Sequence, residues 1–172
     1  MHQIPDHHLG CLYTSPHRHV SLAQLSKGRP HLNIVNVNCQ SASAKRLSLE
    51  RLIGHQRPDI VIGTESWLHA GIGNQTIFPT DVYQVFRRDR EGGNTTMGGV
   101  FILAGKELTV TREEELETDC ELLWCRVEIQ GSGGLHIAAY YRPNEKDEHS
   151  LDELASSTEL RSFQEYLTIV WL

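Results

Sequence analysis

The chain has 172 residues, about the length of one ordinary domain, and 39% of its residues are hydrophobic. Its 16 basic and 22 acidic residues give a formal net charge of −6, which argues against a protein that coats nucleic acid by charge alone. No apolar run approaches the ~20 residues that span a bilayer, and residues 1–11 lack the apolar stretch of a secretory signal. The composition therefore excludes an integral membrane protein and predicts a nuclear or cytoplasmic protein that is not secreted.

The charges are unevenly distributed along the chain. Basic residues cluster in its middle, at Lys45, Arg46, Arg51, Arg57, Arg87, Arg88, Arg90 and Lys106. A short acidic stretch follows, with Glu107, Glu113, Glu114, Glu115, Glu117, Asp119, Glu121 and Glu128. The net charge thus leaves room for a locally basic groove.

Residues 1–30 differ in composition from the remainder. They hold five histidines together with several prolines and glycines, and they show no clean periodicity. We predict a disordered leader over residues 1–30, with a metal-binding tail as the alternative. The cysteines at positions 11, 39, 120 and 125 form no Cys-x-x-Cys pair, which favours reduced thiols over a zinc site.

The first ordered elements are predicted from residue 31 onward. Residues 32–37 alternate and are rich in β-branched side chains, which indicates a strand. Ser41 and Ser43 can cap a following helix, which runs to Gln56 and ends before Pro58. Residues 59–63 form a short apolar run typical of a strand buried on both faces. Strand, helix and strand in this order fit a parallel crossover unit.

The second half of the chain is richer in strands. We predict a loop over residues 68–79, strands over 82–88, 98–104, 122–129 and 135–141, and a helix over 150–167. Residues 131–134 contain three glycines and mark a hairpin between the last two strands. This is an α/β chain with more strands than one parallel unit needs, which indicates a mixed sheet or two packed sheets.

Polar side chains with metal- and phosphate-binding chemistry follow three of these strands. Asn36 and Asn38 close the first strand on one face, and Glu65 lies just beyond the next strand. Ligands gather at the carboxyl ends of strands in α/β sheets, and these oxygen ligands suit Mg²⁺. Tyr141 ends a later strand, where its hydroxyl can touch a phosphate or a metal-bound water. The alternative is that the asparagines make turn hydrogen bonds and that Glu65 and Tyr141 are ordinary strand-end residues.

These residues lie in blocks that together resemble an endonuclease/exonuclease/phosphatase domain. The blocks are residues 32–38, 58–68, 87–90 with 98–103, and 141–144, in the family's order. The form Thr64-Glu65-Ser66-Trp67-Leu68 is most similar to the apurinic-type endonuclease that heads the reverse-transcriptase polyprotein of non-LTR (LINE-like) retrotransposons. The match covers about residues 31–155.

The resemblance implies a four-layer α/β sandwich, in which two packed mixed β-sheets are flanked by helices, with residues 31–172 as its incomplete N-terminal portion. It implies hydrolysis of phosphodiester bonds with Mg²⁺ or Mn²⁺, nicking DNA to prime reverse transcription, with DNA held by its phosphate backbone. It implies no membrane and no obligate protein partner. Residue by residue, Glu65, Asn36 and Asn38 match metal-site positions, and Tyr141 and Asn36 match residues near the scissile phosphate.

The chain also departs from the family pattern. The family's later Asp-x-Asn segment, which orients the attacking water, and its Ser-Asp-His segment, which acts on the phosphate, have no counterpart after Asn144. Asp147-Glu148-His149 follows too early and is predicted to be a solvated helix start. The sequence therefore predicts a truncated endonuclease that is weakly active or inactive. The alternatives are a noncatalytic α/β remnant that binds a partner and a phosphatase-like relative acting on a small phosphorylated substrate.

Overall fold

A computed structural model describes residues 13–14, 18–21, 31–90, 97–129, 132–142, 144, 146–159 and 166–171. Its elements are β1 (Tyr13–Thr14), β2 (Arg18–Ser21), β3 (His31–Asn38), α1 (Arg46–Gln56), β4 (Ile60–Thr64), α2 (Asn74–Ile77), β5 (Tyr83–Arg88), β6 (Val100–Gly105), β7 (Val110–Arg112), the 3₁₀ turn η1 (Glu114–Leu116), β8 (Glu121–Ile129), β9 (Ser132–Tyr141), α3 (Glu148–Glu159) and β10 (Tyr166–Trp171). Most of the leader predicted over residues 1–30 lies outside the described residues, and β1 and β2 fall within it.

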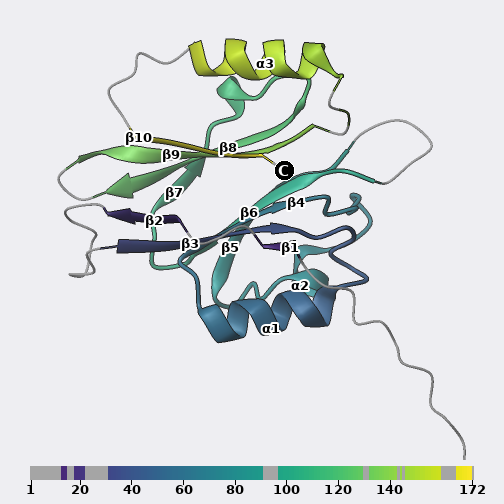
Figure 1. Ribbon diagram of the computed structural model, residues 1–172. Helices are drawn as coiled ribbons and strands as arrows, with labels where there is room; N and C mark the ends of the chain where they lie inside the picture. The colour runs from purple at the N-terminus through teal and green to yellow at the C-terminus, as the bar shows by residue number, and fades with distance from the viewer. Residues whose placement is uncertain are drawn as a thin grey trace, which may run out of the picture.

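The elements form four layers (Figure 1). One sheet has the order β1-β3-β4-β6-β5, with β2 also paired to β3, and the other has the order β10-β9-β8-β7. We call them the first and the second sheet. Helices α1 and α2 cover the outer face of the first sheet, and α3 covers that of the second. The predicted sandwich of two packed sheets between helices is confirmed.

The first sheet contains the predicted crossover. β3 and β4 pair in parallel through α1, while β6 is antiparallel to both β4 and β5. The register aligns Asn38 with Thr64, Thr64 with Val100, and Val100 with Arg88. The carboxyl ends of β3, β4 and β5 therefore lie at one end of the sheet.

The start of α1 differs from the prediction, and its end agrees. The Ser41 hydroxyl accepts a hydrogen bond from the amide of Ala44 at 3.2 Å, so it stabilises the turn before the helix. The N-cap position itself is Lys45, which makes no side-chain capping bond. The helix ends as predicted before Pro58, with Arg57 in the left-handed region at φ 44°.

The second sheet confirms the predicted β8–β9 hairpin and corrects the expected long helix. Helix α3 ends at Glu159, and Tyr166–Trp171 forms β10, which pairs in parallel with β9. The expected helix is wrong at residues 166 and 167, because the β-branched run Thr168-Ile169-Val170 that follows them favours an extended conformation beside an available strand edge. Residues 160–165 lie outside the described residues. Three further short elements were not predicted: β7 and η1 lie in the acidic stretch, and α2 lies within the expected loop.

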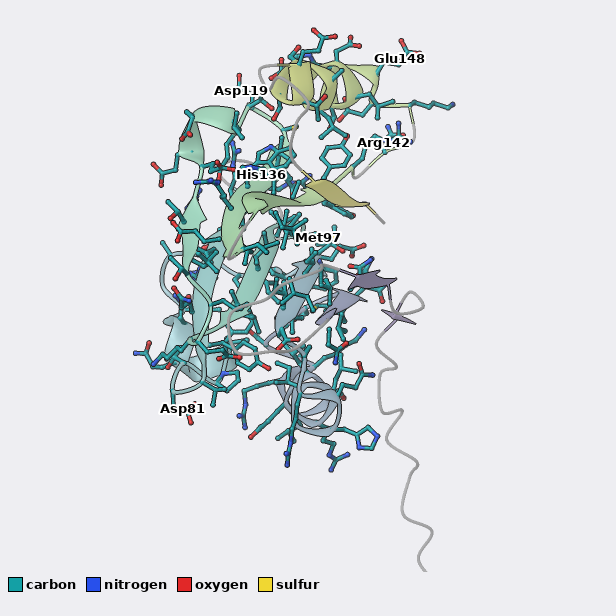
Figure 2. The ribbon with its side chains drawn as sticks, turned by 90° about the vertical axis from the view of Figure 1, so that its left-hand side faces the viewer. Asp81, Met97, Asp119, His136, Arg142 and Glu148 are labelled. Atoms are coloured by element: carbon teal, nitrogen blue, oxygen red, sulfur yellow. The ribbon has the colours of Figure 1, made fainter. Side chains whose placement is uncertain are left out.

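The main core lies between the sheets, where the facing side chains of both are apolar. Among its fully buried members are Ile60, Ile62, Ile102, Leu123, Cys125, Val127, Leu135 and Ile137. Side chains fill this space and the spaces beneath the helices (Figure 2). Cys39, Cys120 and Cys125 are free thiols, and Cys11 lies outside the described residues. No helix among the described residues is long and apolar enough to cross a membrane.

Candidate active site at the ends of β3, β4 and β9

The backbone keeps two chain segments side by side beyond the ends of β3 and β4. Cys39 donates its amide to the Thr64 carbonyl at 2.9 Å, and Ser41 donates to the Glu65 carbonyl at 3.0 Å. Ala42 continues the series by donating to the Ser66 carbonyl at 2.8 Å. The pairing of the two strands is thereby extended past their ends, which places Glu65 beside the last residues of β3.

The turn that carries Glu65 has an unusual backbone. Glu65 and Trp67 have φ values of 51° and 53°, in the left-handed region that side chains with a Cβ avoid. Each such residue costs about 1–3 kcal/mol and persists only where its surroundings hold it. Here Ser66 donates its amide to the Gly99 carbonyl at 3.1 Å, and Trp67 donates to the Gly98 carbonyl at 2.9 Å. The turn is thus held between β3 on one side and the start of β6 on the other.

The Glu65 carboxylate is oriented by Asn38. The Asn38 amide Nδ2 donates to Glu65 Oε1 at 2.9 Å, and Asn38 Oδ1 accepts from the amide of Gln40 at 3.2 Å. Both ends of the Asn38 amide are therefore engaged, and its NH₂ group faces the carboxylate. In this geometry Asn38 positions Glu65, which differs from the direct metal coordination that the resemblance implies.

Asn36 presents an oxygen without a partner. It is half-buried on β3, on the same face as Leu32 and Ile34, whose side chains pack between the sheets. Its Oδ1 is buried and accepts no hydrogen bond from any described residue. An unpaired buried acceptor costs about 1–3 kcal/mol, so this oxygen is suited to a cation, a water molecule or a ligand donor.

Tyr141 reaches the same carboxylate from the second sheet. It is the last residue of β9, and its side chain interacts with that of Glu65. Burial is the main cause that raises the pKa of Tyr141, and the negative charge of Glu65 raises it further. The phenol therefore keeps its proton and acts as a donor. Of the four predicted site residues, Asn38 and Tyr141 both interact with Glu65, and Asn36 lies two residues before Asn38.

Glu121 and the pair Gly98-Gly99 were not predicted as part of the site. Glu121, the first residue of β8, accepts a hydrogen bond from the amide of Gly99, and its Oε1 lies 2.5 Å from Arg90 Nη2. Gly98 and Gly99 have φ values of 114° and 80°, and a Cβ on Gly98 would lie 2.7 Å from Glu121 Oε2. Glu121 thus holds the backbone that holds the Glu65 turn. The two glycines were a detectable signal, whereas no sequence pattern marked Glu121.

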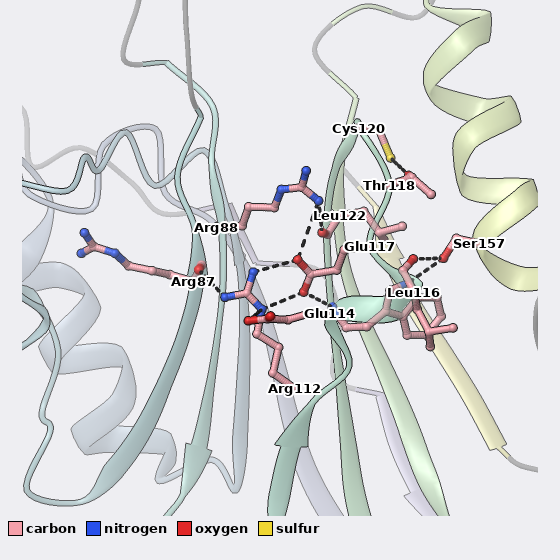
Figure 3. A network of polar contacts seen from close by, with 11 residues as sticks. Arg87, Arg88, Arg112, Glu114, Leu116, Glu117, Thr118, Cys120, Leu122 and Ser157 are labelled. Atoms are coloured by element: carbon pink, nitrogen blue, oxygen red, sulfur yellow. Dashed lines mark hydrogen bonds and ion pairs between the residues drawn. The ribbon is translucent and has the colours of Figure 1, made fainter.

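A cleft of about 930 Å³ adjoins Tyr141. It lies between the end of β5 and residues 112–121, and its lining includes Arg88, Arg112 and Glu117. Arg112 pairs with Glu117 through two contacts, at 2.8 and 2.7 Å, and this hydrogen bonding raises the pKa of Arg112 (Figure 3). The basic middle of the sequence and its acidic stretch therefore meet here, and the cleft has mixed charge.

The residues present fit a hydrated divalent cation. No group of three or more His, Cys, Asp and Glu side chains in the described part of the chain could hold a metal ion. Mg²⁺, however, binds through one or two carboxylates and keeps several waters. Glu65 supplies one carboxylate and Asn36 one unpaired oxygen.

The predicted solvated helix start agrees with the structure: α3 begins at Glu148, which is exposed and points outward (Figure 2).

Neither protein-family models nor curated proteins match this sequence, but solved structures do. The human Nocturnin catalytic domain superposes with a TM-score of 0.62 at 11% identity, covering 90% of this chain and 66% of that one. An AP endonuclease from Archaeoglobus fulgidus gives 0.57 at 18% identity, covering 81% and 56%. The endonuclease domain of TRAS1, a telomere-specific non-LTR retrotransposon, gives 0.56 at 15% identity, covering 80% and 57%.

The chain has the endonuclease/exonuclease/phosphatase fold. It spans between 56% and 66% of the length of these three structures.

Proposed function

We propose that this chain hydrolyses phosphodiester bonds of DNA with Mg²⁺ or Mn²⁺, as the nicking endonuclease of a non-LTR retrotransposon. The observation that carries the proposal is the contact of Glu65 with Asn38 and Tyr141, which brings one carboxylate together with donors from both sheets. The TRAS1 endonuclease domain, a structural neighbour, supports the retrotransposon context. The motif form around Glu65 supports a nuclease over a phosphatase of small substrates.

Each site residue has a distinct part in the proposal. Glu65 and the unpaired Oδ1 of Asn36 would hold the cation, which when bound polarises a phosphoryl oxygen and stabilises the charge of the transition state. Asn38 keeps the Glu65 carboxylate in one orientation. Tyr141, protonated because its pKa is raised, donates to a phosphate oxygen and holds the substrate in place.

Turnover by this chain alone is expected to be slow. The sequence contains no Asp-x-Asn or Ser-Asp-His segment after Asn144. In the family that the chain resembles, these segments orient the attacking water and act on the phosphate. Cation binding at Glu65 needs neither segment, so it can be tested separately from catalysis.

The test compares the wild-type protein with Glu65→Gln, which keeps the shape of the side chain and removes its charge. Glu115→Gln is the matched control, because Glu115 is an exposed glutamate on η1. We expect Glu65→Gln to weaken Mn²⁺ binding at least about tenfold, since ligand-shell changes typically cost 10–100-fold. Slow Mg²⁺-dependent nicking of supercoiled plasmid should disappear with it.

Two results would count against the proposal. Equal Mn²⁺ affinity of wild type and Glu65→Gln would reject the cation site. Absence of nicking by folded wild-type protein in Mg²⁺ and in Mn²⁺ would reject the activity and favour a noncatalytic α/β domain.

A further inference from the structure

Four arginines line the cleft beside Tyr141; all four form ion pairs with carboxylates, and three of these pairs are short. The short pairs are Arg87 with Asp89 at 2.9 Å, Arg90 with Glu121 at 2.5 Å, and Arg112 with Glu117 at 2.7 Å. Arg87 also donates to two backbone carbonyls, those of Ile72 and His69. These three guanidinium groups have little capacity left for a ligand.

Arg88 is engaged differently. Its Nη1 donates to the Leu122 carbonyl at 3.0 Å, and its nearest carboxylate oxygen, on Glu117, is 3.8 Å away. Both oxygens of Glu117 already accept from Arg112. Arg88 Nε and Nη2 donate to no described residue, and the side chain is 29% exposed. Figure 3 shows the Arg88 guanidinium joined to the Leu122 carbonyl and to Glu117. Arg88 therefore has the longest ion pair of the four arginines, and its Nε and Nη2 groups keep donors that reach no described residue.

The backbone places Arg88 close to the candidate active site. It ends β5 opposite Val100, and Val100 lies opposite Thr64, the residue before Glu65. Tyr141 connects the two places, since it lines the cleft and contacts Glu65. A guanidinium offers a planar fork of donors that matches the oxygens of a phosphate group. A ligand whose first phosphate is held at Tyr141 could therefore place a second phosphate at Arg88.

We propose that Arg88 binds a second phosphate group of the same nucleic-acid strand whose scissile phosphate lies at Glu65 and Tyr141. This inference rests on the proposed function, and it makes the substrate an oligonucleotide or polynucleotide instead of a small phosphate ester. Because carboxylates neutralise the neighbouring arginines, the cleft supplies one phosphate contact and not a continuous basic track. The contact is independent of nucleotide sequence, since it is made to the phosphate backbone.

The experiment measures binding without cleavage. The probe is a short fluorescein-labelled DNA duplex in EDTA, and its affinity is followed by anisotropy over a series of salt concentrations. Arg88→Gln removes the charge and keeps an amide that can reach the Leu122 carbonyl. Arg51→Gln, on the exposed face of α1, is the matched control for loss of one positive charge.

We expect Arg88→Gln to weaken binding about tenfold and to lower the slope of log K against log salt by about 0.9, the value for one duplex phosphate contact. Arg88→Lys should keep the slope and lose part of the affinity, because an ammonium group retains the charge without the fork. Arg51→Gln should change neither quantity. Thermal melting of each variant establishes that it is folded.

Wild-type affinity and slope in folded Arg88→Gln, or equal losses in Arg51→Gln, would overturn the inference, as would a wild-type protein that binds no duplex. Mn²⁺ affinity, measured on the same proteins, reports on Glu65 alone. Retained Mn²⁺ binding with unchanged DNA binding in Arg88→Gln therefore rejects the Arg88 subsite and leaves the proposed function standing. Loss of the DNA contact in Arg88→Gln, together with no Mn²⁺ binding by the wild type, rejects the proposed function and with it the inference that rests on it.

Discussion

The space between the sheets and the end of the sandwich near Glu65 differ in almost every physical respect. Between the sheets, Ile62, Ile102 and Leu123 are fully buried on regular strands. At the site end lie four of the five described non-glycine residues with positive φ: Gln40, Ser41, Glu65 and Trp67. Buried polar atoms without a described partner also gather there, on Asn36, Thr64 and Trp67.

The difference separates stability from function within one small fold. Regular, apolar packing contributes most of the free energy of folding, and strained backbone with unpaired polar groups costs free energy. Proteins keep such costs where a ligand or a reaction needs them. The contrast makes the end near Glu65 the candidate site on energetic grounds, independently of any motif.

The largest expected effect is in the core. Leu123 is 0% exposed between the sheets, so Leu123→Ala should lower the free energy of unfolding by about 2–5 kcal/mol, through lost burial and the cavity left behind. Leu47→Ala is the control, because Leu47 on α1 is 60% exposed and should change stability by no more than about 0.5 kcal/mol. Equilibrium urea unfolding measures both. Similar losses in the two variants would contradict the assignment of the core.

A smaller effect is expected where the site end depends on glycine. Gly99→Ala should cost about 2 kcal/mol, because φ is 80° and the new Cβ would lie 2.6 Å from Ser66 Oγ. The same change at Gly54, within α1, meets open space and should stabilise the protein by up to about 1 kcal/mol. Urea unfolding should thus give opposite signs for one chemical substitution. The same sign at both positions would show that the Gly99 turn is not strained.

The smallest effect is a loss of stability at alkaline pH, with one thiol in each region. Burial raises the pKa of Cys39, near the site, and of Cys125, in the core, from 9.0 to about 12. Above about pH 9 the unfolded chain releases these protons while the folded protein keeps them. The unfolding free energy should therefore fall by about 1 kcal/mol for each thiol between about pH 8 and pH 10.

Urea midpoints measured between about pH 8 and pH 10 test this linkage. Cys39→Ala and Cys125→Ala should each flatten the dependence. A slope in either variant equal to that of the wild type would show that the thiol concerned does not carry the effect.

Most of the regular elements could be predicted from local patterns. β3 and β4 follow from alternation and a short apolar run, and β8 and β9 follow from their hairpin glycines. The helix expected over residues 150–167 is wrong at residues 166–167, which begin β10 beside the edge of β9, and residues 160–165 lie outside the described residues. β7 was missed, since its three residues lie within an acidic stretch with no periodicity.

The candidate site could be predicted only in part. Asn36, Asn38, Glu65 and Tyr141 follow strand ends, which local reasoning can locate, and in the structure Asn38 and Tyr141 both interact with Glu65. Their roles in metal and phosphate binding stay predictions. Arg88 lies in the basic block of residues 87–90 and Glu121 in the acidic stretch, but neither block indicates which residue is important, because that depends on partners 34 and 22 residues away in the chain.

The amino-acid sequence alone specifies the class of fold and the residues proposed to carry out the chemistry, Asn36, Asn38, Glu65 and Tyr141. It can do so because burial patterns and strand ends are local properties of the chain. Only the tertiary structure decides which arginines pair with carboxylates and which keep donors for a ligand. Arginines and carboxylates that form separate blocks in the sequence face each other once the sheets pack. Electrostatic energy depends on distance in space, so packing alone determines that Arg90 and Arg112 are paired and that Arg88 keeps free donors.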